Sequence, residues 1–247
     1  MSRPTISIQL YTLRDAMAQN EAETLEKVAA LGYEGVEGGY PASRVFIDKC
    51  RELGLKVTGT HASIDALESD FEKIVAQNKE TGTQFVIVPY IGEEWRGSLE
   101  KWTKLAQKLE QIGQKLRDEG LTLCYHNHDF EFENIDGKYG LDVLYEAADP
   151  QYLQAELDTY WVQKGGASPV EYLRKYAGRT PILHIKDMAA DGNFAEVGNG
   201  TLDWPAIFSA AEAGGVTVYV VEQDTCPGDP FDSIALSIEN LRKMGKI

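Results

Sequence analysis

The chain has 247 residues, of which 43% are hydrophobic, and a formal net charge of −15. A chain of this length and apolar content can bury one complete core, and α/β barrels commonly use about 250 residues as a single domain. The negative charge disfavours phosphate backbones and anionic lipid, so we expect neither nucleic acid nor a membrane surface as a partner.

The first residues, MSRPTISIQLYTLRD, lack a basic stretch followed by a long apolar one. No run of about 18 apolar residues occurs anywhere, so we expect a cytoplasmic protein. The cysteines, Cys50, Cys124 and Cys226, are far apart and form no C-x-x-C pair. They predict reduced, mostly buried thiols rather than disulfides or a cysteine zinc site.

A helical stretch, a glycine and a short apolar run follow one another repeatedly along the chain. The pattern occurs in AALGYEGVEGG, RELGLKVTGTH, KETGTQFVIVPY, RDEGLTLCYHNH and AEAGGVTVYVVEQD, and the runs TISIQLY, YLQAELD and TPILHIKD complete a set of eight candidate strands. Glycines in this place end helices in the left-handed conformation. Here they are Gly32, Gly54, Gly82, Gly120 and either Gly214 or Gly215.

Helical segments are predicted between and after these strands. Eight units of about 30 residues match a (β/α)8 TIM barrel over residues 1–247, as a single domain, better than an open doubly wound sheet. The nearly continuous apolar strands agree, because parallel strands are covered on both faces. The predicted helices span 21–31, 43–53, 70–81, 98–119, 139–148, 169–176, 203–213 and 231–243.

Two irregular stretches follow predicted strands. DFEFENIDGKYG alternates polar and apolar residues around a D-G turn, which predicts an extended loop or a small hairpin. GNFAEVGNGTLDW is rich in glycine and has only weak helical signal. Because barrel enzymes have their active sites at the carboxyl ends of the strands, we expect both stretches to cover a substrate.

Side chains that can bind a metal end several of the apolar runs. Asp158 follows LQAEL, His184 follows PIL and Glu222 follows VYVV. A single strand-end aspartate is more often a helix N-cap, and a single histidine is more often a hydrogen-bonded core residue. Strand ends converge on one barrel mouth, however, so the coincidence of all three predicts a divalent cation site.

The segments SIQLYTLRD, GYEGVEGG, YHNHDFEF, ELDTYW, HIKD, EVGNGTLDW and VVEQD resemble the sugar phosphate isomerase/epimerase group of xylose isomerase-like TIM barrels. The resemblance covers essentially the whole chain, and the order and spacing of the motifs are more specific than any one of them. It implies a divalent metal held by a glutamate, an aspartate, a histidine and a second glutamate from strands five to eight. Asp158, His184 and Glu222 match the last three positions.

The first ligand position departs from that pattern, because the fifth strand reads LTLCYHNH where a glutamate is expected. The spacing to Asp158 favours His126, with His128 second and Glu131 third. In ketose epimerases the two glutamates are thought to transfer the proton as a pair, and one histidine nitrogen cannot both bind metal and act as a base. The predicted ligands are His126, Asp158, His184 and Glu222.

We predict proton transfer beside a metal-polarised carbonyl of a small carbohydrate. Glu222 is the preferred base or acid, His126 a second candidate, and Lys186 a third that either reaches a substrate oxygen or pairs with Asp187 or another carboxylate. Oxygen and nitrogen ligands favour Mn²⁺, Mg²⁺, Co²⁺ or Zn²⁺. Predicted substrate contacts, which include orienting and ring-stacking side chains, are Gln9, Glu37, His61, Tyr90, His128 and Trp161.

Three other functions stay open. Dehydratases that act on keto-inositols resemble the chain almost as well, so an inosose dehydratase-like lyase is the second hypothesis. A non-catalytic sugar-binding barrel has only the missing glutamate in its support. An endonuclease IV-like nuclease needs many histidines for three metals, whereas this chain has 4, and Trp161 occupies a position where that nuclease has a ligand. Barrels of the resembled group often form homodimers.

Overall fold

The computed structural model describes residues 3–247. Eight strands, all in parallel pairs, form a closed barrel in which the first strand pairs with both the second and the last. The predicted TIM barrel is therefore confirmed. The barrel strands are β1 (Thr5–Gln9), β2 (Gly35–Gly39), β3 (Lys56–His61), β4 (Phe85–Val88), β5 (Thr122–His126), β8 (Gln154–Asp158), β9 (Ile182–Ile185) and β12 (Val218–Val221).

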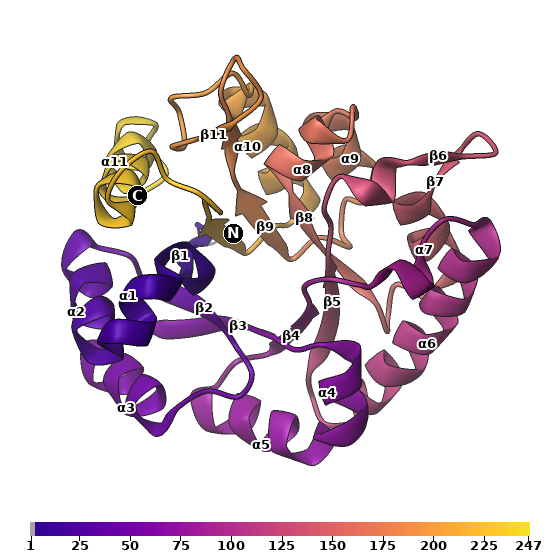
Figure 1. Ribbon diagram of the computed structural model, residues 1–247, viewed down its shortest axis with the longest axis horizontal. Helices are drawn as coiled ribbons and strands as arrows, with labels where there is room; N and C mark the ends of the chain where they lie inside the picture. Colours follow the sequence, from indigo (N-terminus) through magenta and orange to yellow (C-terminus); the bar gives the residue numbers. More distant parts are fainter. Residues whose placement is uncertain (1–2) are drawn as a thin grey trace.

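The predicted helices surround the strands, each within one residue of its expected ends (Figure 1). Glycines in the left-handed conformation end several of them, and Gly215, with φ 81°, fills the position that the sequence left between two glycines. Within residues 3–247 no helix is both long and apolar enough to cross a membrane. The helices are α2 (Glu21–Leu31), α3 (Arg44–Leu53), α5 (Phe71–Thr81), α6 (Leu99–Asp118), α7 (Gly140–Ala147), α9 (Pro169–Lys175), α10 (Trp204–Gly214) and α11 (Pro230–Lys243).

Short helical turns that the sequence did not predict lie mostly just after barrel strands. They are too short to show a helical period of apolar residues, so no sequence pattern indicates them. They are η1 (Leu10–Leu13), α1 (Arg14–Gln19), α4 (Ile64–Ser69), η2 (Glu93–Trp95), η3 (Phe130–Phe132) and α8 (Thr159–Lys164).

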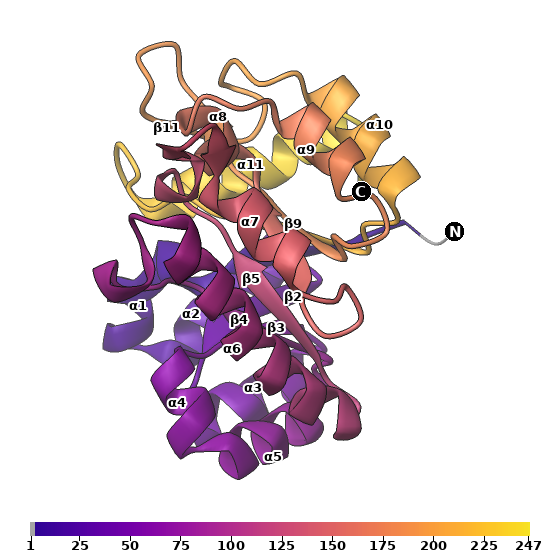
Figure 2. The same ribbon diagram turned by 90° about the vertical axis from the view of Figure 1, so that its right-hand side faces the viewer.

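Two small antiparallel pairs extend from the barrel. β6 (Asn134–Ile135) and β7 (Lys138–Tyr139) form the predicted small hairpin, and its two turn residues both have positive φ, as a tight hairpin turn requires. β10 (Asp187–Met188) pairs with β11 (Phe194–Ala195) in the glycine-rich stretch after β9. Figure 2 shows β11 and α8 together at one end of the molecule.

The barrel interior contains an apolar cluster that is separate from the main core between strands and helices. Its members come from four strands and are almost fully buried, which closes the barrel below the polar strand ends. Cys50 and Cys124 are buried and Cys226 is partly buried, and all three are free thiols, as predicted. The interior cluster consists of Ile87, Cys124, Ile182, Val218 and Val220, with Phe85 packed against it.

Candidate functional site

The strand register brings together the side chains predicted as metal ligands. At the end of β8, Asp158 lies beside His184 of β9, while His126 of β5 lies beside Glu156 of β8. Glu222 follows the last strand. His126, Asp158, His184 and Glu222 are all buried, and each contributes one candidate ligand atom to a group within 4.8 Å of one another.

The two other candidates for the first ligand position lie outside this group. The Glu131 carboxylate accepts hydrogen bonds from the Tyr125 hydroxyl at 2.7 Å and from the His128 backbone N–H at 2.8 Å. Glu131 therefore anchors the turn after β5. The His128 ring lies on the wall of the cavity described below, where burial lowers its pKa to about 3 and keeps it neutral.

Asp158 has one satisfied and one unsatisfied carboxylate oxygen. Oδ1 accepts the Trp161 backbone N–H at 2.9 Å and so caps the N-terminus of α8. Oδ2 is buried without a hydrogen-bond partner, 3.4 Å from Lys186 Nζ and 3.8 Å from His126 Nε2. Burial raises the pKa of Asp158 to about 7. An unpaired buried carboxylate oxygen is costly, and a bound cation would relieve that cost.

The buried Lys186 side chain lies among three carboxylates at the same mouth. Its Nζ is 3.0 Å from Glu222 Oε2, 2.9 Å from Asp224 Oδ2 and 3.4 Å from Asp158 Oδ2. Burial alone would lower the pKa of Lys186, but these carboxylates raise it above its usual value. Lys186 is therefore an ammonium ion, suited to bind or protonate an oxygen rather than to act as a base.

Asp187, the other partner considered for Lys186, is not part of that ion-pair network. Its carboxylate is buried, and five N–H groups donate to it from the stretch between β10 and α10. Of the two alternatives considered for a Lys186 ion pair, the structure therefore has the neighbouring carboxylates and not Asp187, whose carboxylate holds a loop. The donors are the backbone N–H groups of Met188, Gly198, Gly200 and Leu202 and the Trp204 indole Nε1.

Glu37, predicted as a substrate contact, is fully buried inside the barrel. Its Oε1 lies 2.7 Å from His184 Nε2, 2.9 Å from His61 Nε2 and 2.8 Å from Gln9 Nε2. A carboxylate in this position fixes the ring orientation of a histidine whose other nitrogen faces a metal. The contacts favour the orienting role for Glu37 over direct contact with a substrate.

Glu156, a second deep carboxylate, was missed by the sequence analysis. Its Oε2 lies 3.2 Å from His126 Nδ1, 3.2 Å from His184 Nε2 and 3.3 Å from His61 Nε2. A signal was present in QAELD, because residues two apart on a strand point to the same side and Glu156 stands two before Asp158. Asp224, which lies two residues after Glu222 and beyond the end of β12, was also missed.

The two histidines of the four-residue group differ in charge. Burial would lower the pKa of His184, but the carboxylates of Glu156 and Glu37 raise it well above its usual value. Burial and then the neighbouring charge on His184 lower the pKa of His126 far below its usual value. His126 is therefore a neutral imidazole with a ring nitrogen available as a ligand or a base.

A cavity of about 540 Å³ opens directly above this group. Its volume falls within the range of small-molecule sites, and it combines aromatic rings with a few polar groups, as such sites usually do. Of the predicted substrate contacts, His61, Tyr90, His128 and Trp161 line it, whereas Gln9 lines an adjoining cavity. The complete lining is Tyr11, His61, Pro89, Tyr90, His126, His128, Trp161, Phe194, Glu222 and Asp224.

Comparison with known proteins places this barrel in a family. Residues 25–244 match the family described as xylose isomerase-like TIM barrel. The chain belongs to that family. Its members include isomerases, epimerases and dehydratases, which agrees with the resemblance that the sequence motifs carry.

Individual relatives are distant in sequence. The inosose dehydratase of Clostridium beijerinckii is 24% identical over 221 residues, which cover 81% of this chain and 67% of the relative. The structure of a sugar phosphate isomerase/epimerase from Parabacteroides distasonis superposes with a TM-score of 0.88 at 22% identity, over 100% of this chain and 96% of the other. A 3-keto-D-glucoside 4-epimerase from E. coli gives 0.76 at 18% identity, over 98% and 100%.

Proposed function

We propose that the protein is a divalent-metal-dependent sugar isomerase or epimerase that moves a proton on the carbon beside a carbonyl group. The observation that carries the proposal is the buried group of His126, Asp158, His184 and Glu222, of which His126 and Glu222 line a small-molecule cavity. Membership of a family rich in isomerases and epimerases supports it.

The residues of this group fit a divalent cation. Two carboxylates and two imidazole nitrogens, that of His184 after release of its extra proton, would form a mixed donor set suited to Mn²⁺, Mg²⁺, Co²⁺ or Zn²⁺. The unpaired Asp158 Oδ2 lies among them. When bound, such a cation polarises a carbonyl and makes the adjacent C–H bond more acidic.

Three side chains at the mouth supply the proton chemistry in this proposal. Glu222 lines the cavity, and although burial opposes its charge, the nearby Lys186 ammonium lowers the pKa of Glu222 and keeps it ionised. Glu222 therefore starts as the base. Lys186, 3.0 Å from it, stabilises a developing negative charge on oxygen. His126, neutral and also on the cavity wall, is the second proton acceptor only when its Nε2 does not bind the cation, because its Nδ1 faces Glu156.

A dehydratase is the second candidate function. The observation in its favour is the similarity to inosose dehydratases over most of the chain. Elimination of water begins with the same proton abstraction, so the same three side chains would serve both reactions. The products differ, because only elimination releases water and leaves a carbon–carbon double bond.

Hydrogen exchange tests the proposal before the natural substrate is known. The protein, first analysed for its metal content, is incubated with Mn²⁺ in D₂O and a panel of keto-sugars and inososes, and deuterium incorporation is followed by NMR. We expect exchange at the carbon beside the carbonyl, and new olefinic or dehydrated products only if the protein is a lyase. Absence of exchange across the whole panel would contradict the proton-transfer proposal.

A matched variant separates the site from the rest of the barrel. In the Asp158→Ala, His184→Ala double variant, two of the four ligands are lost, so we expect tight Mn²⁺ binding and exchange to disappear together. Wild-type metal affinity in this variant would refute the ligand assignment. Glu100→Ala is a suitable control, because Glu100 is an exposed residue of α6 that pairs only with Lys104.

A further inference from the structure

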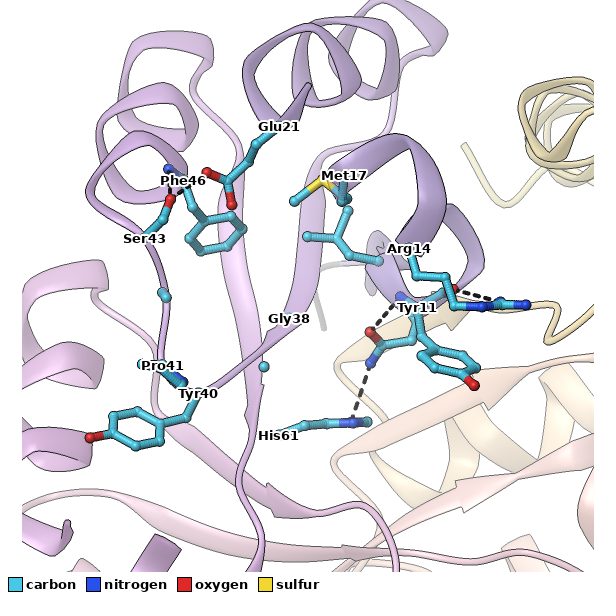
Figure 3. Close-up of a pocket in the computed structure, with 14 residues that line it drawn as sticks. Tyr11, Arg14, Met17, Glu21, Gly38, Tyr40, Pro41, Ser43, Phe46 and His61 are labelled. Atoms are coloured by element: carbon cyan, nitrogen blue, oxygen red, sulfur yellow. Dashed lines mark hydrogen bonds between the residues drawn. The ribbon is translucent and has the colours of Figure 1, made fainter. Parts of the chain in front are cut away.

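A second cavity, of about 410 Å³, adjoins the one that contains the four-residue group. It lies between β1 with its following turn and the end of β2. Tyr11 and His61 line both cavities, so they form the common wall across which a single ligand can extend. Figure 3 shows Met17 and Phe46 on one side of this space and His61 and Tyr11 on the others.

The side chains around this second cavity are mainly carbon. Leu10 and Phe46 are buried core residues whose surfaces form part of its wall, and Met17, Pro41 and Ala42 add further apolar surface. A surface of this kind favours an apolar or aromatic group over a second polar ring, because it offers few unpaired hydrogen-bond partners.

Three of the polar side chains on the wall, Ser43, Gln9 and Arg14, already have partners within the protein. The Ser43 hydroxyl donates to Glu21, and the Gln9 amide lies between Glu37 and His61. Arg14 donates to two backbone carbonyls, of Tyr11 and Asp224, and its guanidinium lies 4.6 Å from the centre of the Tyr11 ring.

The charges around the cavity argue against an anionic ligand such as a phosphate group. Glu21 places a carboxylate on the wall, and the whole chain has a net charge of −15. The one guanidinium there uses its Nη1 to donate to two carbonyl oxygens. A neutral group therefore fits better than a charged one.

We propose that the second cavity is an aglycone subsite, and that the substrate is a glycoside with an apolar or aromatic aglycone rather than a free or phosphorylated sugar. The proposal rests on the proposed function, since the sugar ring is taken to occupy the first cavity. The aglycone then extends past Tyr11 and His61 into the second, where Met17 and Phe46 contact it.

Gly39 offers a way to fill this subsite without disturbing the fold. It lies at the end of β2 on the wall of the second cavity, its φ is not in the left-handed region, and a Cβ added there meets no atom within 4 Å. Gly228 has the same two properties but lines neither cavity, which makes Gly228→Phe a matched control for Gly39→Phe.

The test compares 3-keto-D-glucose with its phenyl glycoside in the Mn²⁺-dependent hydrogen-exchange reaction. We expect Gly39→Phe to lower kcat/KM for the phenyl glycoside at least about tenfold more than for the free sugar. Gly228→Phe should leave the ratio of the two values at that of the wild type. An equal loss for both compounds in Gly39→Phe would overturn the subsite.

A binding measurement keeps the outcome separate from that of the proposed function. Saturation-transfer NMR with phenyl β-D-glucoside should show strong transfer to the phenyl protons in the wild type and in Gly228→Phe, and weak transfer in Gly39→Phe. If no exchange activity is found but this pattern holds, the proposed function fails and the subsite stands. If the wild type bound glucose 6-phosphate but not phenyl glucoside, and Gly39→Phe abolished that binding, the proposal of an aglycone subsite would be refuted.

Discussion

Two kinds of buried carboxylate lie at the carboxyl ends of the barrel strands, and they differ in how many donors face them. Asp187 receives five N–H groups, and Glu131 receives a hydroxyl and a backbone N–H. Asp158, equally buried, has an oxygen that accepts no hydrogen bond, although Lys186 Nζ lies 3.4 Å from it. Glu222 meets only the side chains of Lys186 and His184.

The number of donors distinguishes carboxylates that anchor loops from carboxylates that we propose bind a ligand. Buried carboxylates are stable when donors satisfy them, so a satisfied one needs nothing further to explain its presence. An unsatisfied one is destabilising on its own and is retained where a partner from outside the chain completes it. On this criterion Asp158 belongs to the proposed site, and Asp187 and Glu131 belong to the scaffold. Glu222 belongs to the proposed site because it lines the cavity and its partners are themselves side chains of the mouth.

The largest expected effect comes from Asp158→Asn. The amide keeps the oxygen that caps α8 but loses the negative charge. We expect kcat/KM in the exchange reaction to fall about a thousandfold, equivalent to about 4 kcal/mol, with little change in Tm. Steady-state kinetics and calorimetry measure the two quantities. A large fall in Tm with activity retained would show that Asp158 stabilises the scaffold and does not belong to the proposed site.

Asp187→Ala should lower the stability of the protein and leave its metal affinity unchanged. Five donors lose their acceptor, and one of them belongs to Gly200, which packs directly against the Asp187 carboxylate, so we expect the free energy of unfolding to fall by roughly 3 kcal/mol. Urea denaturation measures the change. Asp187→Asn, which keeps one acceptor oxygen, should lose less, and metal affinity per folded molecule should stay at the wild-type value. A loss of metal affinity without a loss of stability would show that Asp187 belongs to the proposed site and not to the scaffold.

Glu37→Gln tests the carboxylate beneath the proposed metal site. A glutamine oxygen cannot hold His184, His61 and Gln9 as a carboxylate does, so the His184 ring loses its fixed orientation. We expect Mn²⁺ affinity to fall about tenfold to a hundredfold, the usual effect of losing such a partner. Titration calorimetry measures it, and His61→Gln is the comparison that leaves the Glu37–His184 contact in place. Unchanged affinity would show that Glu37 is only structural.

Glu131→Gln should alter the pH dependence of stability. Burial raises the pKa of Glu131 to about 8, against an ordinary value of 4.5, so the folded state retains a proton that the unfolded state has lost. Stability from this group is therefore present at low pH and declines as the pH rises from about 4.5 to about 8, at no more than about 1.4 kcal/mol per pH unit. The variant should lack this decline in urea midpoints. An identical pH profile would contradict the assigned pKa.

The sequence predicted the barrel and the meeting of four side chains because both follow from local patterns. Apolar runs that end in Asp158, His184 or Glu222 identify strands and their exits together. Neighbouring strands are offset along the barrel, however, so His126 lies beside Glu156 rather than Asp158. That offset, which helps to bring the buried carboxylates of Glu37 and Glu156 together, is a property of the closed sheet. No single segment of the sequence indicates it.

The role of Asp187 was equally hidden from the sequence. HIKD predicted a residue at the mouth, but its donors come from backbone N–H groups one residue and 11 to 15 residues further on, and from the Trp204 indole. Backbone donors carry no residue-type signal. The glycine-rich stretch was therefore predicted only to cover a substrate, although one of its glycines, Gly200, packs directly against the Asp187 carboxylate.

The anchored loop between β10 and α10 also determines how a ligand enters. It carries Phe194 on the cavity wall, and it is held by Asp187 at one point and by the Tyr160 hydroxyl on the Gly192 carbonyl at another. A wall fixed in advance removes an ordering cost from binding, because no segment has to be immobilised when the ligand arrives. Association at this mouth should therefore be limited by diffusion and desolvation rather than by closure of this loop.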